Sequence, residues 1–101
     1  MGLNKQKAAI VVAENLGMPE EFIDSCKDAL REALIIQRSS LYEVADDVVK
    51  RLIDTTNEPR WLCHIYPAKV DAGLSYFRKG SICLTFGPPD MLYECRIACL
   101  Y

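Results

Sequence analysis

Only one place in this chain sets a cysteine beside a histidine. Cys63 and His64 are neighbours, and His64 is the single histidine among 101 residues. A thiol nucleophile needs its base within hydrogen-bond reach, but adjacent side chains on a regular strand point to opposite faces. His64 would therefore need Cys83, Cys95 or Cys99 from another strand. The pattern does not favour a Cys–His enzyme.

A metal site is the other chemistry to weigh. Cys95 and Cys99 are four residues apart, which brings two thiols together on a helix but sets them about 13 Å apart on a strand. A zinc site of Cys63, His64, Cys95 and Cys99 would have unusual ligand spacing, and no CxxC, phosphate-binding or HExxH motif is present. We therefore predict no enzyme, no metal and no cofactor, with a Cys/His metal or thiol site as the less favoured alternative.

Composition narrows the class of protein. Half of the residues are hydrophobic, which predicts one folded domain over 1–101. The 12 Lys and Arg nearly balance the 14 Asp and Glu, so the net charge is too weak to gather nucleic acid. No stretch has the roughly 20 apolar residues of a membrane span or the form of a secretory signal, and the five scattered cysteines indicate reduced thiols. We expect a cytoplasmic protein that binds neither nucleic acid nor membrane.

The sequence pattern of the elements that must position these residues changes from helical to strand-like at Pro59. Helical spacing dominates before it, with Pro19 expected at the first position of one helix and Ser40 and Glu43 forming a capping box for the next. Short apolar or alternating runs dominate after it. The expected helices cover about 19–37 and a second stretch that starts at 40 and ends within 54–57. The expected strands cover 7–13, 61–66, 81–86 and 91–101.

The last part of the chain also predicts how the strands pair. Lys79 and Gly80 suit a tight hairpin between 74–78 and 81–86, which leaves 67–73 as a loop. Together the elements predict an α+β domain with two helices packed on a small, mostly antiparallel sheet. Sheet edges and a second face would then be open to a partner. Aromatic side chains expected there, or equally in the core, are Tyr66, Tyr76, Phe77, Tyr93 and Tyr101.

This order of elements resembles the eight-kilodalton dynein light chains. The resemblance covers about 5–87 and is carried by Lys7-Ala8-Ala9-Ile10, Met18-Pro19-Glu20-Glu21, Pro59-Arg60-Trp61-Leu62-Cys63 and Tyr76-Phe77-Arg78-Lys79-Gly80-Ser81-Ile82-Cys83-Leu84. It implies a non-enzymatic adaptor of a microtubule motor or other cytoskeletal complex. Such an adaptor binds extended peptides, for example from a dynein intermediate chain, which add as a strand to an exchanged strand in a groove walled by the second helix. The resemblance also implies a homodimer made by strand exchange.

Site residues follow from the resemblance position by position. Tyr76 matches a tyrosine that lines the family's groove, Glu43 stands where the family has a lysine, and Leu62 stands where the family has a dimer-interface histidine. The candidate partner or interface residues are Glu43, Leu62, Cys63, His64, Ile65, Tyr66, Tyr76, Phe77 and Arg78.

Two stretches depart from the family. The 67–73 loop is too short for the exchanged strand, and 88–101 extends past the point where the family's chain stops. We expect the tail strand to fill the sheet edge that the short loop leaves bare, in its own subunit or in a neighbour. The alternative function is an architectural homo-oligomer without a peptide groove.

Overall fold

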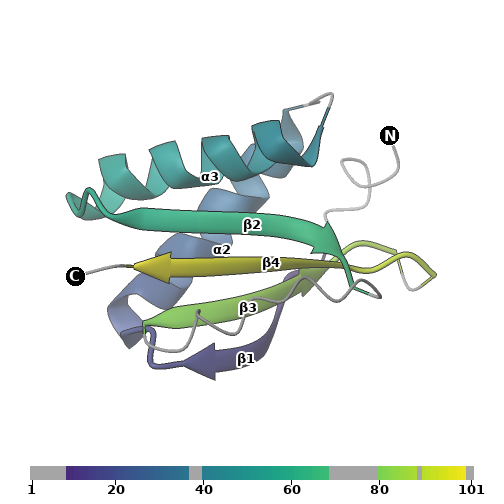
Figure 1. Ribbon diagram of the computed structural model, residues 1–101, viewed down its shortest axis with the longest axis horizontal. Coiled ribbons are helices and arrows are strands. Elements are labelled where there is room, and N and C mark those ends of the chain that lie inside the picture. The colour runs from purple at the N-terminus through teal and green to yellow at the C-terminus, as the bar shows by residue number, and fades with distance from the viewer. Residues whose placement is uncertain (1–8, 37–39, 69–79, 89, 100–101) are drawn as a thin grey trace.

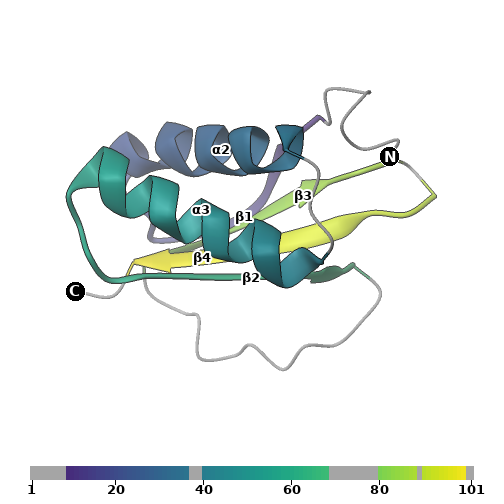
Figure 2. The same cartoon turned by 90° about the horizontal axis from the view of Figure 1, so that it is seen from above.

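The computed structural model describes residues 9–36, 40–68, 80–88 and 90–99. The elements follow in the order β1 (Val11–Leu16), α2 (Glu20–Ile35), α3 (Leu41–Thr56), β2 (Trp61–Pro67), β3 (Ser81–Phe86) and β4 (Tyr93–Cys99). The four strands form one antiparallel sheet (Figure 1), and both helices lie on one side of it (Figure 2). The predicted α+β architecture is confirmed.

Helix α2 begins one residue later than the sequence predicts. Pro19 has a ψ of 139°, outside the helical range, so it is the N-cap residue and not the first helical residue. Glu20 and Glu21 still occupy the first turn, where negative charge is favourable. The helix ends at Ile35, and Ile36, which lies inside the predicted range 19–37, is 46% exposed. The buried face of α2 consists of Cys26, Ala29, Leu30, Ala33 and Leu34.

Helix α3 has the ends that its sequence predicts. The Ser40 hydroxyl accepts a hydrogen bond from the Glu43 N–H at 3.3 Å, which satisfies one amide that the first turn leaves without an intrahelical partner. At the other end, Asn57 takes a left-handed conformation with φ 62°, and its N–H donates to the Ile53 carbonyl at 3.0 Å. None of the described helices combines the length and apolar character needed to cross a bilayer.

The strand order in the sheet is β1-β3-β4-β2. Strand β4 therefore lies inside the sheet, where it pairs along its length with β3 on one side and β2 on the other. The tail forms the predicted strand in its own subunit, but the predicted edge position is wrong. Its alternating pattern sets only which face packs against the helices, where Cys95, Ile97 and Cys99 are buried, and does not specify its neighbours in the sheet.

The predicted hairpin at Lys79 and Gly80 is also wrong for β3. This strand pairs with β1 over Val11–Leu16 and with β4 over Tyr93–Ala98, so both of its hydrogen-bonding edges are filled. The proposed partner strand, 74–78, lies outside the described residues. Pro67, which was predicted to begin a loop over 67–73, belongs instead to β2, and residues 69–73 lie outside the described part of the chain.

Strand β1 continues past its predicted end at Ala13 and ends at Leu16. Most of it is exposed, and an outer strand tolerates polar residues such as Glu14 on its exposed side. The register with β3 shifts between Val12 and Glu14. Asn15 then turns the chain toward α2, because its side-chain Oδ1 accepts a hydrogen bond from the Met18 N–H at 2.8 Å.

The core fills the space between the helices and the sheet. Trp61, at the start of β2, packs its ring edge-on against Phe22 of α2 with centroids 5.5 Å apart. Its indole Nε1–H donates to the Thr56 hydroxyl at 3.0 Å, so the buried ring also has a polar partner. The largest fully buried side chains are Phe86, Leu30, Leu52, Ile82, Leu84, Ile97 and Val48.

Candidate functional site

Strand β2 is an outer strand, and among the described residues it pairs only with β4. The hydrogen bond from the Ala68 N–H to the Leu92 carbonyl, 2.9 Å long, fixes which residues face β4. Main-chain groups of successive residues point to alternate sides of a strand, so the even-numbered residues of β2 bond to β4. The N–H and C=O groups of Cys63 and Ile65 consequently face away from the sheet.

Two further observations agree with this alternation. Cys99, which lies opposite Trp61, donates its N–H to the Gly80 carbonyl on the β3 side at 3.0 Å and not to β2. Pro67, which has no N–H, occupies one of the outward positions, where no ladder bond is lost. The outer edge of β2 therefore presents the main-chain donors and acceptors of Trp61, Cys63 and Ile65 in a row.

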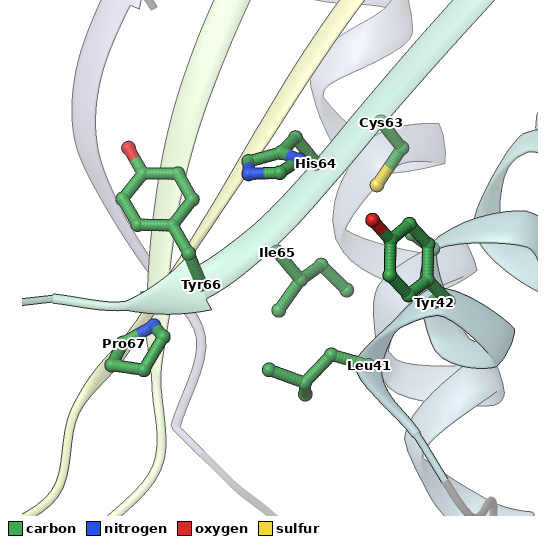
Figure 3. A pocket seen from close by; sticks show the side chains of 8 residues that line it. Leu41, Tyr42, Cys63, His64, Ile65, Tyr66 and Pro67 are labelled. Atoms are coloured by element: carbon green, nitrogen blue, oxygen red, sulfur yellow. The ribbon is translucent and has the colours of Figure 1, made fainter. Parts of the chain in front are cut away.

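A groove of about 270 Å³ lies between this edge and the first half of α3. Figure 3 shows that Cys63 and Ile65 point toward Leu41 and Tyr42 of the helix, while His64 and Tyr66 lie on the other side of β2. The groove therefore reaches around the edge of the strand instead of opening onto one face. Its lining residues are Leu41, Tyr42, Ala45, Cys63, His64, Ile65, Tyr66 and Pro67.

The structure brings together four of the candidate residues and leaves two of the described ones, Leu62 and Glu43, outside the groove. Cys63, His64, Ile65 and Tyr66 line the groove. Leu62 is 41% exposed but does not line it, and Glu43, in the first turn of α3, does not line it either. The remaining candidates, Tyr76, Phe77 and Arg78, lie outside the part of the chain that the structure describes.

The sequence-based candidates do not include four of the groove residues, namely Leu41, Tyr42, Ala45 and Pro67. Of these, Tyr42 has a side chain that is 85% exposed, and it faces the Cys63 thiol across the groove in Figure 3. Helical spacing assigns Tyr42 to the solvent side of α3, which is correct, but spacing alone does not show that β2 lies beside that turn. A large aromatic residue placed outside an apolar stripe was the available signal, because exposed aromatic rings are typical interface anchors.

Tyr66 is held by a polar network on the sheet face away from the helices. Its hydroxyl donates to Glu94 Oε1 at 2.8 Å and accepts from Arg96 Nε at 2.9 Å. The Arg96 guanidinium also approaches Glu14 of β1 at 3.5 Å. Burial raises the pKa of Tyr66, and the Arg96 hydrogen bond opposes that shift. The network connects three strands, so Tyr66, only 7% exposed, forms a fixed wall at one end of the groove.

Cys63 and His64 do not form a nucleophile–base pair in this structure. His64 and Cys63 lie on opposite sides of β2 (Figure 3), so the pair cannot act as nucleophile and base. The His64 ring packs instead against the Tyr66 ring, with centroids 5.2 Å apart. The Cys63 sulfur contacts Cys95 at 3.6 Å. Among the described residues, no group of three or more Cys, His, Asp or Glu side chains is arranged to hold a metal ion.

A second cavity, of about 280 Å³, lies between the two helices. No strand edge borders it, so it offers no row of main-chain groups to a ligand. Its lining is more polar than that of the groove and consists of Ser25, Asp28, Ala29, Glu32, Arg51, Asp54 and Thr55. The groove at β2 is therefore the better candidate for a binding site.

A scan against protein-family models and searches of curated proteins and of solved structures found no match for this chain. The resemblance to the eight-kilodalton dynein light chains rests on the residues quoted for it and stays a prediction.

Proposed function

We propose that this protein is a non-enzymatic adaptor that captures an extended peptide at the outer edge of β2. The observation that carries the proposal is the coincidence of two features at one place. The outward main-chain groups of Cys63 and Ile65 lie on the edge that borders the groove beside α3. A strand added there would form ladder hydrogen bonds to the edge while its side chains enter the groove.

The walls of the groove give the peptide's two rows of side chains different surroundings. Residues that alternate along a strand point to opposite faces. One row would meet Leu41, Ile65 and the Cys63 thiol, which are apolar, and the other would meet His64 and Tyr66. We therefore expect a partner segment that alternates apolar with polar or aromatic residues.

The opposite edge of the sheet is a poorer place for strand addition. Strand β1 is the other outer strand, but its register shifts between Val12 and Glu14. Such an irregularity interrupts the even spacing of main-chain groups and discourages pairing with another chain. Strand β2 pairs with β4 in continuous register from Trp61 to Pro67, so it offers an even template.

We also propose the setting that the family resemblance implies. In this setting the protein acts in the cytoplasm as a component of a microtubule motor or cytoskeletal complex, and its partner is an intermediate-chain peptide. The position of the groove beside the second helix supports this assignment, because the resemblance places the family's peptide groove there. The charge reversal at Glu43 predicts that the preferred sequences differ from those of the family.

Hydrogen exchange of single amides tests the binding mode. The full chain is titrated with a linear peptide from a dynein intermediate chain and, separately, with peptides selected on it from a random linear library. Strand addition predicts slower exchange at the Cys63 and Ile65 amides, which face outward, and little change at His64, whose amide already bonds to β4. Binding that leaves the Cys63 and Ile65 amides unprotected would overturn strand addition.

A matched pair of variants tests whether the peptide binds in the groove. Ala45→Trp places an indole ring in the groove and should abolish peptide binding, whereas Thr55→Trp, on the same helix but away from the groove, should leave it unchanged. Equal affinity in both variants would place the binding site elsewhere. Mass in solution is measured in parallel: a stable oligomer that binds no peptide from either source would replace the adaptor with the architectural alternative.

A further inference from the structure

Two reduced cysteines meet at the wall of the groove. Cys63 on β2 and Cys95 on β4 are both free thiols, and their sulfur atoms are 3.6 Å apart. They are diagonal neighbours across the two strands, since Cys63 lies opposite Ile97 and Cys95 lies opposite Ile65. Both side chains are therefore on the helix-facing side of the sheet, with no intervening residue between the sulfurs.

The two thiols differ in their access to solvent. Cys63 is half-buried and lines the groove, so a small solute in the groove can reach its sulfur. Cys95 has no exposed surface. A dissolved oxidant therefore meets Cys63 first and reaches Cys95 only through it. This arrangement of one accessible thiol backed by one buried thiol is typical of an attacking and a resolving cysteine.

We propose that Cys63 and Cys95 form a redox-sensitive thiol pair, in which hydrogen peroxide oxidises Cys63 and Cys95 then closes a disulfide. In the first step the Cys63 thiolate attacks one peroxide oxygen, the O–O bond breaks, and the products are a sulfenic acid and hydroxide, which takes up a proton to become water. In the second step the Cys95 sulfur displaces the sulfenic hydroxyl, which leaves as a second water molecule with the Cys95 proton. Two thiols lose two electrons, and one peroxide is reduced to two waters.

The second step sets the pH dependence. The hydrogen bond with Cys63, burial in the core, and the nearby Cys26 and Cys83 thiols raise the pKa of Cys95 well above its usual range. The thiolate is the attacking species in this chemistry, so a protonated Cys95 reacts slowly. We expect disulfide closure to accelerate as the pH rises, while the accumulated intermediate at lower pH is the Cys63 sulfenic acid.

Closing the disulfide would disturb the groove, and this part of the inference rests on the proposed function. A disulfide brings the two sulfurs to about 2.05 Å and the Cα atoms to roughly 4.4–6.8 Å, whereas diagonal neighbours in antiparallel strands are about 7–8 Å apart. Strand β2 would therefore move relative to β4, and the Cys63 sulfur would leave the groove wall. The Cys63 main-chain N–H and C=O, which would pair with an added strand, would move together with the Cys63 side chain. The row of outward main-chain groups on β2 would therefore no longer be evenly spaced.

The thiol pair is tested on the full chain. Reduced protein is treated with hydrogen peroxide, remaining thiols are alkylated, and the cross-linked peptides are mapped by mass spectrometry. We expect a loss of two hydrogen atoms and a link between Cys63 and Cys95. The Cys63→Ser variant should lose it, and Cys83→Ser should retain it, because Cys83 lies opposite Arg96 on the other sheet face. Over-oxidation of Cys63 with Cys95 still alkylatable, or a link between Cys63 and Cys26, would overturn the pair.

The effect on the groove has its own readout. Reduced and peroxide-oxidised protein are titrated with the peptide selected on the reduced form, and we expect at least a tenfold weaker Kd after oxidation, restored by dithiothreitol. A mapped disulfide with unchanged Kd would overturn control of the groove. Absence of any peptide binding by the reduced protein would count against the proposed function and not against the thiol pair, whose test is the cross-link.

Discussion

Thr56 shows how one hydroxyl group joins two elements of this fold. Its Oγ1 donates to the Leu52 carbonyl at 2.6 Å and accepts from Trp61 Nε1 at 3.0 Å. It also accepts from the Glu58 N–H at 3.3 Å. The same oxygen therefore ties the last turn of α3, the connection after it and the first residue of β2. Since β2 carries the groove, Thr56 helps to fix where the groove begins.

Replacing Thr56 with valine should destabilise the protein. Thr56→Val keeps the shape but leaves the Trp61 indole N–H, which is buried, without its acceptor. An unsatisfied buried donor costs about 1–3 kcal/mol, so urea denaturation should show a free energy of unfolding lower by that amount. Thr55→Val, at the neighbouring exposed position, is the control and should change stability little. Equal stability of both variants would contradict the role assigned to the hydroxyl.

At the scale of elements, the sequence predicted the helices better than the sheet. Both helices have strong local signals, namely the apolar spacing and the Ser40 and Glu43 pattern, and these signals act within a few residues. Strand pairing depends on contacts between residues far apart in sequence. Lys79 and Gly80 suggested a local hairpin, but β3 satisfies both edges through distant strands, β1 and β4. Turn chemistry alone could not show that β4 would occupy the position beside β3.

The sequence predicted only part of the candidate site, because local signals identify a segment but not its tertiary neighbours. Cys63, His64, Ile65 and Tyr66 belong to the apolar run after Pro59 that predicts a strand, and all four line the groove. Leu62, which the family resemblance indicates, lies outside the groove. Tyr42 and Leu41 come from the helix, and their place beside β2 follows only from tertiary packing.

A pair of proline variants tests the alternation along β2. The Cys63 N–H faces outward, so Cys63→Pro removes no ladder bond, whereas His64→Pro removes a bond to β4. We expect the circular dichroism of Cys63→Pro to remain that of a folded protein and its melting temperature to fall less than that of His64→Pro. Greater destabilisation by Cys63→Pro would mean that the outward and inward residues of β2 are exchanged.

At the scale of the molecule, the core combines apolar side chains with thiols that remain protonated. Burial raises the pKa of Cys26 to about 12 from an ordinary 9.0, and burial also raises the pKa values of Cys83 and Cys99. In the unfolded chain these thiols titrate normally. Above about pH 9 the unfolded state therefore loses protons that the folded state keeps, and stability falls as the pH rises toward the folded pKa.

This linkage gives a measurable alkaline slope. Between about pH 8 and about pH 10, the free energy of unfolding in the presence of reductant should decrease, with each such thiol contributing up to about 1.4 kcal/mol per pH unit. Cys26→Ala should make the slope shallower by the share of one thiol. Ile82→Val, a core substitution without a titrating group, should lower stability equally at every pH. Identical slopes in the Cys26→Ala variant and the parent would contradict the linkage.

The central place of β4 has a consequence during synthesis. Residues 93–99 provide the only pairing that connects β2 to the rest of the described sheet. Until that stretch has left the ribosome, β2 lacks the one ladder partner that the described sheet gives it, and its main-chain groups on the β4 side have no strand to pair with. Unpaired apolar strands of this kind are the segments that chaperones shield from premature association.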